Sequence, residues 1–133
     1  MTKTLWQVVA QSKKGKAFVT SRTQSRNLQK VLETIDEENI AKIYGEWQSI
    51  AKRWNNDAEF DKLLKENGGF VDARDDDFYV SFANWLVAQG EEVFNAFQER
   101  GHTAVIEYKK QHKIQSRDYL FEGMIKPFRP YIS

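Results

Sequence analysis

Apolar side chains recur at intervals of three and four residues between residues 40 and 54, and this spacing constrains the fold more than any other feature. A helix with 3.6 residues per turn places such positions on one face. The repeat covers about four helical turns, so the segment predicts a long amphipathic helix with one buried face. Its members are Ile40, Ile43, Tyr44, Trp47, Ile50, Ala51 and Trp54.

The same spacing recurs before and after this segment. The further stripes are Leu28, Val31, Leu32 and Ile35; Phe60, Leu63 and Leu64; Phe78, Phe82, Trp85, Leu86 and Gln89; Val93, Phe94 and Phe97; Val105, Tyr108 and Gln111; and Tyr119, Leu120 and Met124. Gly68, Gly69, Gly90 and Gly101 interrupt them, as glycines do at helix ends. We therefore expect an all-α fold: one compact bundle of about six to seven helices.

Polar residues indicate where several of these helices begin. Thr34 and Glu37 have the spacing of a capping box, in which each side chain accepts a backbone amide of the other residue. The run Asp75–Asp77 precedes an apolar stripe and is typical of an N-cap followed by acids in the first turn. Thr103 is suited to cap the helix that carries Val105.

The two ends of the chain are harder to interpret. Residues 5–20 fit either a first helix or a β-hairpin over the basic turn Ser12–Lys16, because so few residues define no clear period. Pro127 and Pro130 cannot lie inside an α-helix, so we expect an extended C-terminal tail. The aromatic and Arg content of residues 125–132 suits either an interface or an arm strapped over the bundle.

Length and composition bound the class of protein. The 133 residues suit a single helical domain over residues 1–133, and 41% apolar residues suffice for a core. The absence of Cys excludes disulfides, a thiolate nucleophile and Cys-based zinc sites. No apolar run approaches the ~20 residues that cross a bilayer, and the start lacks the apolar region of a signal peptide. We expect a cytoplasmic protein without a membrane segment.

The formal net charge of +1 hides a segregation of charge along the chain. Residues 1–30 hold seven Lys or Arg and no acid, whereas residues 31–100 are strongly acidic. The basic segment, with Lys13, Lys14, Lys16, Arg22 and Arg26, suits either an anion-binding face or a terminus that docks on the acidic middle. A nucleic-acid-binding domain usually has a pI above ~9, and the sequence pI of 7.9 favours docking.

No catalytic set emerges from the motifs. The run Asp72–Asp77 lacks both the alternation and the glycine of an EF-hand loop, so a helix cap is favoured over a cation site. His102 and His112 would point about 80° apart on one helix and cannot share a metal. No nucleophile elbow, P-loop or dinucleotide-binding motif occurs. We expect no catalytic residues, no metal and no cofactor.

One segment resembles a known family. Asp76, Asp77, Tyr79, Phe82, Trp85, Leu86 and Gly90 match the Asp-Asp-x-aromatic-x-x-Phe-x-x-Trp-Leu-x-x-x-Gly pattern of the bacterial family called domain of unknown function 4240. The resemblance extends roughly over residues 4–100, including Leu5-Trp6 and Leu28–Trp54, and leaves residues 101–133 as an extension. The chain departs from the pattern at Asp75 and Ala83, where members often have Ser and Arg. The resemblance implies a mostly helical bacterial cytosolic domain with a helical N-terminus, and no activity.

The function expected from these observations is that of a non-catalytic protein-binding module, with segregated charge that steers a complementary partner. Its most specific form is an immunity-type protein whose acidic middle neutralises a basic bacterial toxin. Two alternatives stay open: nucleic-acid association through the basic N-terminal segment, and a metal-assisted enzyme that uses Asp75–Asp77. The residues expected to bind the protein partner are Asp72, Asp75, Asp76, Glu91 and Glu92.

Overall fold

The described part of the structure, a computed structural model, is built from helices alone. It describes residues 2–52, 78–114 and 125–132, with only the backbone for residues 78–81. The helices are α1 (Leu5–Ser12), α2 (Ser21–Leu32), α3 (Glu37–Lys52), α5 (Phe78–Ala88), α6 (Glu91–Arg100), α7 (His102–Gln111) and the 3-10 helix η3 (Lys126–Tyr131). No strand occurs in these residues, and the predicted all-α class is confirmed. Trp54 and the helices predicted near Phe60 and Tyr119 lie outside them.

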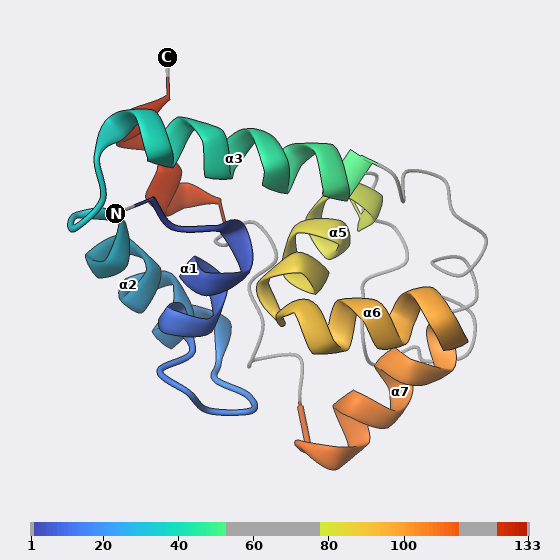
Figure 1. Cartoon of the computed structure of the whole chain (residues 1–133). Helices are drawn as coiled ribbons and strands as arrows, with labels where there is room; N and C mark the ends of the chain where they lie inside the picture. Colours follow the sequence, from blue (N-terminus) through green and yellow to red (C-terminus); the bar gives the residue numbers. More distant parts are fainter. Residues whose placement is uncertain (1, 53–77, 115–124, 133) are drawn as a thin grey trace.

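The helices are arranged around one continuous core. Helix α3 crosses above α1 and α5, α6 and α7 pack against each other, and η3 lies between α3 and α2 (Figure 1). The largest fully buried side chains include Trp47, Trp85, Phe82, Phe97 and Phe128. Val105 of α7 and Phe128 of η3 belong to the same apolar cluster as side chains of α1, α2, α3, α5 and α6. The described residues 102–114 and 125–132 therefore contribute to the same core as residues 5–52 and 82–97.

The N-terminal segment is helical, so the hairpin alternative for residues 5–20 is wrong. Helix α1 starts with a capping box in which Thr4 and Gln7 each accept the other's backbone amide. Its buried residues Leu5, Val8, Val9 and Ser12 have helical spacing. The turn after Ser12 leads directly into α2, whose N-cap Thr20 accepts the amide of Thr23.

Two predicted helix starts are each wrong by two residues. The oxygen that caps α3 belongs to Asp36, which accepts the Asn39 amide at 2.9 Å, while the Thr34 hydroxyl donates to the Val31 carbonyl. Aspartate caps as well as threonine does, and here it adds a negative charge at the positive helix end. Helix α7 starts at His102 after Gly101, so Thr103 lies inside it and donates to the Arg100 carbonyl. His102 is accordingly the first residue of α7.

The C-terminal segment 125–132 packs against the core, and most of it is a 3-10 helix. Lys126–Tyr131 forms a 3-10 helix with Pro127 at its start, so the extended conformation predicted there is wrong. Short 3-10 turns make few internal hydrogen bonds and therefore accommodate proline. The ring of Phe128 lies 5.4 Å from that of Tyr44 and 5.6 Å from that of Trp47, between centroids. This packing favours the strap interpretation of the tail.

Candidate functional site

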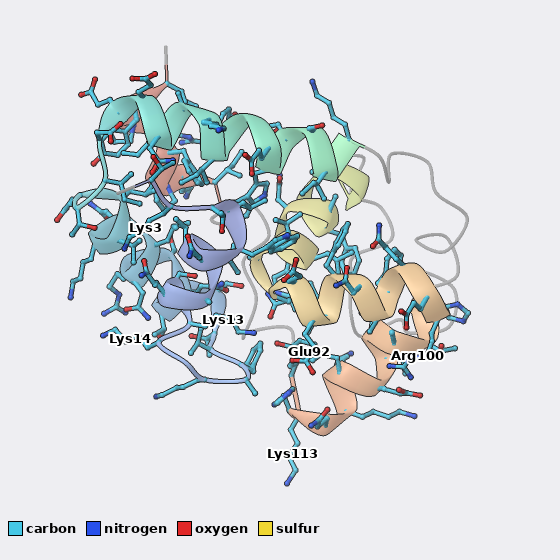
Figure 2. All side chains as sticks on the ribbon, in the orientation of Figure 1. Lys3, Lys13, Lys14, Glu92, Arg100 and Lys113 are labelled. Atoms are coloured by element: carbon cyan, nitrogen blue, oxygen red, sulfur yellow. The ribbon has the colours of Figure 1, made fainter. Side chains whose placement is uncertain are left out.

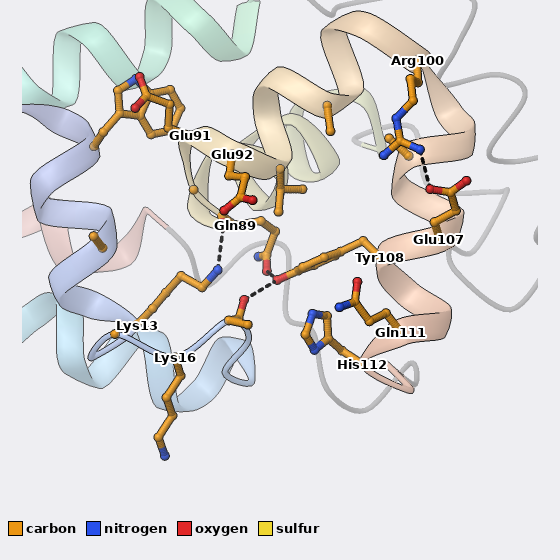
Figure 3. Close-up of a pocket in the computed structure, with 18 residues that line it drawn as sticks. Lys13, Lys16, Gln89, Glu91, Glu92, Arg100, Glu107, Tyr108, Gln111 and His112 are labelled. Carbon is orange, nitrogen blue, oxygen red and sulfur yellow. Dashed lines mark hydrogen bonds and ion pairs between the residues drawn. The ribbon is translucent and has the colours of Figure 1, made fainter.

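An open pocket of about 700 Å³ lies where α1 and its following loop meet the α5–α6 turn and helices α6 and α7 (Figure 3). Its half-buried and buried lining combines the largely apolar side chains of Trp6, Val93, Ala96, Ala104 and Tyr108 with three polar ones, Lys13, Gln89 and His112. Exposed charged side chains surround this apolar floor: Lys16, Glu91, Glu92, Arg100 and Glu107. We call these five the charged rim. Because the rim carries both signs, the pocket offers complementary positions to a partner of either charge.

Two of the five predicted binding residues, Glu91 and Glu92, belong to this rim. Both are exposed and lie in the first turn of α6, where the helix dipole stabilises negative charge. Neither carboxylate makes an ion pair within the described residues. The other three, Asp72, Asp75 and Asp76, lie outside the described residues, as does the predicted cap Asp75–Asp77.

Lys13 is the most informative residue at the pocket, because it is a buried cation. Only 7% of its surface is exposed, and its ammonium group donates to the Gln89 carbonyl oxygen at 2.6 Å. The nitrogen also lies 5.9 Å from the centroid of the Tyr108 ring. Burial lowers the pKa of Lys13, while the negative charge of Glu92 opposes that shift. The lysine thus joins α1 to the α5–α6 turn.

Tyr108 closes the floor of the pocket through its hydroxyl group. The oxygen lies 2.9 Å from Gln89 Oε1 and 3.1 Å from the carbonyl oxygen of Ala17. Burial raises the pKa of Tyr108 far above its usual value, so the phenol keeps its proton at neutral pH. The residue is buried among core side chains, as the sequence suggested, and its hydroxyl has a positioning role between segments far apart in the chain.

His112 lies at the edge of the pocket. Its ring stacks on Phe18 at 5.8 Å and meets the edge of Tyr108 at 4.8 Å, between centroids. Burial and the positive charge of Lys13 both lower the pKa of His112. The imidazole is therefore neutral at pH 7.

The predicted basic segment divides into two groups in the structure. Lys13 points into the molecule and donates to the Gln89 carbonyl oxygen, near the end of the acidic stretch 31–100, whereas Lys14 next to it points away from the pocket (Figure 2). Lys14, Lys16, Arg22 and Arg26 are all exposed. Docking of the basic terminus on the acidic segment is thus found for one of the five residues.

The sequence did not reveal this pocket because its contacts are remote in the chain. Lys13 and Gln89 are 76 residues apart, and Tyr108 and Ala17 are 91 residues apart. The one available signal was the position of Lys13 three residues after the apolar segment that ends at Ala10, where a lysine can reach helix-end carbonyls.

Metal and membrane sites were also sought. Within residues 2–52, 78–114 and 125–132, no three His, Asp or Glu side chains come together in a way that could hold a metal ion. None of the helices in those ranges has the length and apolar content that a membrane crossing requires.

Comparisons with known proteins gave no match: no family model, no curated protein and no solved structure is similar to this chain. The resemblance to domain of unknown function 4240 therefore stays a prediction from the motif residues.

Proposed function

We propose that this chain is a non-catalytic, cytosolic protein-binding module whose partner docks on the charged rim of the pocket. The observation that carries the proposal is the position of Glu91 and Glu92. Both stand exposed on the rim of a pocket of about 700 Å³, and neither makes an ion pair with another residue that the structure describes. An apolar centre within a polar, solvent-accessible rim is the usual anatomy of a protein interface.

The floor supplies residues that are suited to anchor a partner. Trp6 is half-buried at the pocket and packs on Phe94 at 5.6 Å between ring centroids. Tyr108 presents one side of its ring to Lys13. Aromatic side chains in such positions dominate interface energetics because they bury much area with little loss of conformational entropy.

The acidic side of the rim favours a partner with a basic surface. Two adjacent carboxylates on α6 would attract cationic side chains and raise the rate of association. An immunity-type protein that covers a basic bacterial toxin is the specific class that we propose within this description. Asp72, Asp75 and Asp76 remain proposed contacts for such a partner.

The test reverses the charges of Glu91 and Glu92, and a matched pair of glutamates on α3 serves as the control. Glu37 and Glu38 occupy the first turn of α3 as Glu91 and Glu92 occupy the first turn of α6, and all four are exposed. The variants Glu91→Lys/Glu92→Lys and Glu37→Lys/Glu38→Lys therefore have equal net charge and lose equal helix-dipole stabilisation. The wild-type chain and each variant are crosslinked in native lysate, and the captured partner is identified by mass spectrometry and purified. Calorimetry then measures the affinity of the wild type and of each variant for this partner.

We expect the rim variant to bind the purified partner at least about tenfold more weakly, because like charges across an interface are costly. The α3 variant should retain the wild-type affinity. Equal affinities for both variants, or a wild-type chain that binds no stoichiometric partner, would contradict the proposal.

A further inference from the structure

The described part of the molecule has a second charged surface, which shares Lys16 with the charged rim and extends from there over α2. It consists of five exposed cations on α2 and on the loop before it: Lys14, Lys16, Arg22, Arg26 and Lys30. We call these residues the basic face. Figure 2 shows Lys14 directed away from Lys13 and Glu92, toward the side on which α2 lies.

The geometry of α2 aligns three of these cations. Arg22, Arg26 and Lys30 follow each other at intervals of four residues, so each turns only about 40° from the previous one around the helix. The buried side of α2 carries Ser21, Gln24, Asn27, Leu28 and Leu32, and the three cations therefore form a row on its outer side. At 1.5 Å per residue the row is about 12 Å long.

No ion pair neutralises the basic face within the residues that the structure describes. None of its five side chains makes an ion pair or a hydrogen bond to another side chain in the described part of the chain. No acid lies between residues 2 and 32, and the first turn of α2 has no acidic residue that would neutralise its dipole. The positive end of α2 thus adds to the field of Lys14, Lys16 and Arg22.

The residues next to these cations on α2 indicate which kind of anionic partner the basic face suits. The other exposed residues of α2 are Thr23 and Gln29, which are polar, so the row offers no apolar anchor for a protein interface or for insertion into a membrane. A phosphate backbone needs no such anchor, because release of its counterions drives binding by charge alone. Arginine also matches phosphate oxygens with two parallel hydrogen bonds. Adjacent phosphates of one duplex strand are 3.4 Å apart along the axis, so a 12 Å row spans about three to four of them.

We propose that the basic face binds the phosphate backbone of nucleic acid without sequence specificity. This binding depends on positive charge centred on α2, whereas the proposed protein partner is attracted by Glu91 and Glu92 on α6; only Lys16 is common to the two surfaces. Five phosphate contacts give a slope of log affinity against log salt of about −4 to −5 on duplex DNA.

The experiment measures fluorescence anisotropy of a labelled 20-base-pair DNA duplex of mixed sequence, titrated with the full chain at several salt concentrations between about 50 and 200 mM. The variant is Arg22→Gln/Arg26→Gln, and the control is Lys42→Gln/Lys52→Gln. The control removes the same two charges from exposed positions on α3. Glutamine is a good helix former, and circular dichroism checks that both variants fold.

We expect the wild-type chain to bind with the predicted slope. The arginine variant should bind at least about tenfold more weakly at the lowest salt, with a slope smaller in magnitude by about two, whereas the lysine control should match the wild type. Three results would overturn the proposal: no binding to the duplex, equal losses in both variants, or binding to anionic phosphatidylserine vesicles without binding to DNA.

Discussion

The ammonium nitrogen of Lys13 lies 2.6 Å from the carbonyl oxygen of Gln89, which follows the last residue of α5. The carbonyl one residue earlier, on Ala88, accepts from the side-chain amide of Gln24 in α2. Residues at a helix C-terminus leave carbonyls without partners inside the helix. Here side chains from two other elements satisfy them, and a cation does so at the negative end of the helix dipole.

Lys13→Met keeps the aliphatic part of the side chain and removes this hydrogen bond. We expect the free energy of unfolding to fall by about 2 kcal/mol, because hydrogen bonds to charged groups contribute about 1.5–3 kcal/mol and the buried carbonyl loses its partner. Lys14→Met is the control, since its side chain is exposed and should change stability by less than about 0.5 kcal/mol. Urea unfolding measures both, and equal effects would show that Lys13 does not cap α5.

Gly90 holds the turn between α5 and α6 in a conformation that other residues avoid. Its φ of 109° and ψ of 168° lie in a region open essentially to glycine alone. We expect Gly90→Ala to lower the free energy of unfolding by about 1–3 kcal/mol through backbone strain, since an added Cβ would meet only Lys13 Nζ at 3.9 Å.

Gly45 provides the opposite case in the same chain. It is exposed within α3, and a Cβ there would meet nothing within 4 Å. Gly45→Ala should therefore raise the free energy of unfolding by about 0.5–1 kcal/mol. Thermal or urea unfolding of the two variants should give shifts of opposite sign, and a loss of stability in both would contradict the conformational argument.

Lys113 ends α7 in the left-handed conformation, with a φ of 52°. The Ile114 amide donates to the Lys109 carbonyl and the Lys113 amide to the Lys110 carbonyl, which is the hydrogen-bond pattern of a Schellman motif. Glycine is the usual residue at this position because it has no Cβ. We expect Lys113→Gly to raise the midpoint of urea unfolding, with a gain of about 0.5–1 kcal/mol. An unchanged or lower midpoint would mean that the lysine contributes other contacts.

The sequence predicted the helices well because their signal is local. Apolar residues at intervals of three and four identified the buried faces of α2, α3, α5, α6 and α7, with Leu28, Trp47, Trp85, Phe97 and Val105 fully or almost fully buried. Gly90 and Gly101 were correctly predicted to end α5 and α6. Helix starts were less certain because Thr34 and Asp36 have similar capping energies, and the choice between them depends on packing.

The sequence predicted the exposed acids of the candidate site but not the pocket beside them, because only the acids have a local signal. The exposure of Glu91 and Glu92 follows from their position in the first turn of α6. The pocket beside them depends on how α1 and α7 approach the α5–α6 turn, and no local pattern encodes that approach. The burial of Lys13 and the exposure of its neighbour Lys14 differ because of a tertiary contact, so two adjacent lysines with the same sequence signal have different roles.

The pH dependence of stability should depend on His112, which faces Lys13, Tyr108 and Phe18. Its pKa in the folded chain lies below the value of about 6.5 that it has when unfolded. Between these two values the unfolded chain binds more protons than the folded one, so the free energy of unfolding falls as pH falls through this window. Above pH 6.5 the neutral ring carries no such penalty, and below the folded pKa the loss is complete.

Other groups titrate over the same range, so the contribution of His112 must be obtained as a difference. Urea unfolding at pH 7.5 and at pH 5.0 should show a larger loss of stability for the wild-type chain than for His112→Gln, which has no titrating ring. The same comparison in a Lys13→Met background should give a smaller difference, because the charge of Lys13 is one cause of the lowered pKa. Parallel pH profiles for the wild type and His112→Gln would show that protonation of His112 does not destabilise the junction of α1 and α7.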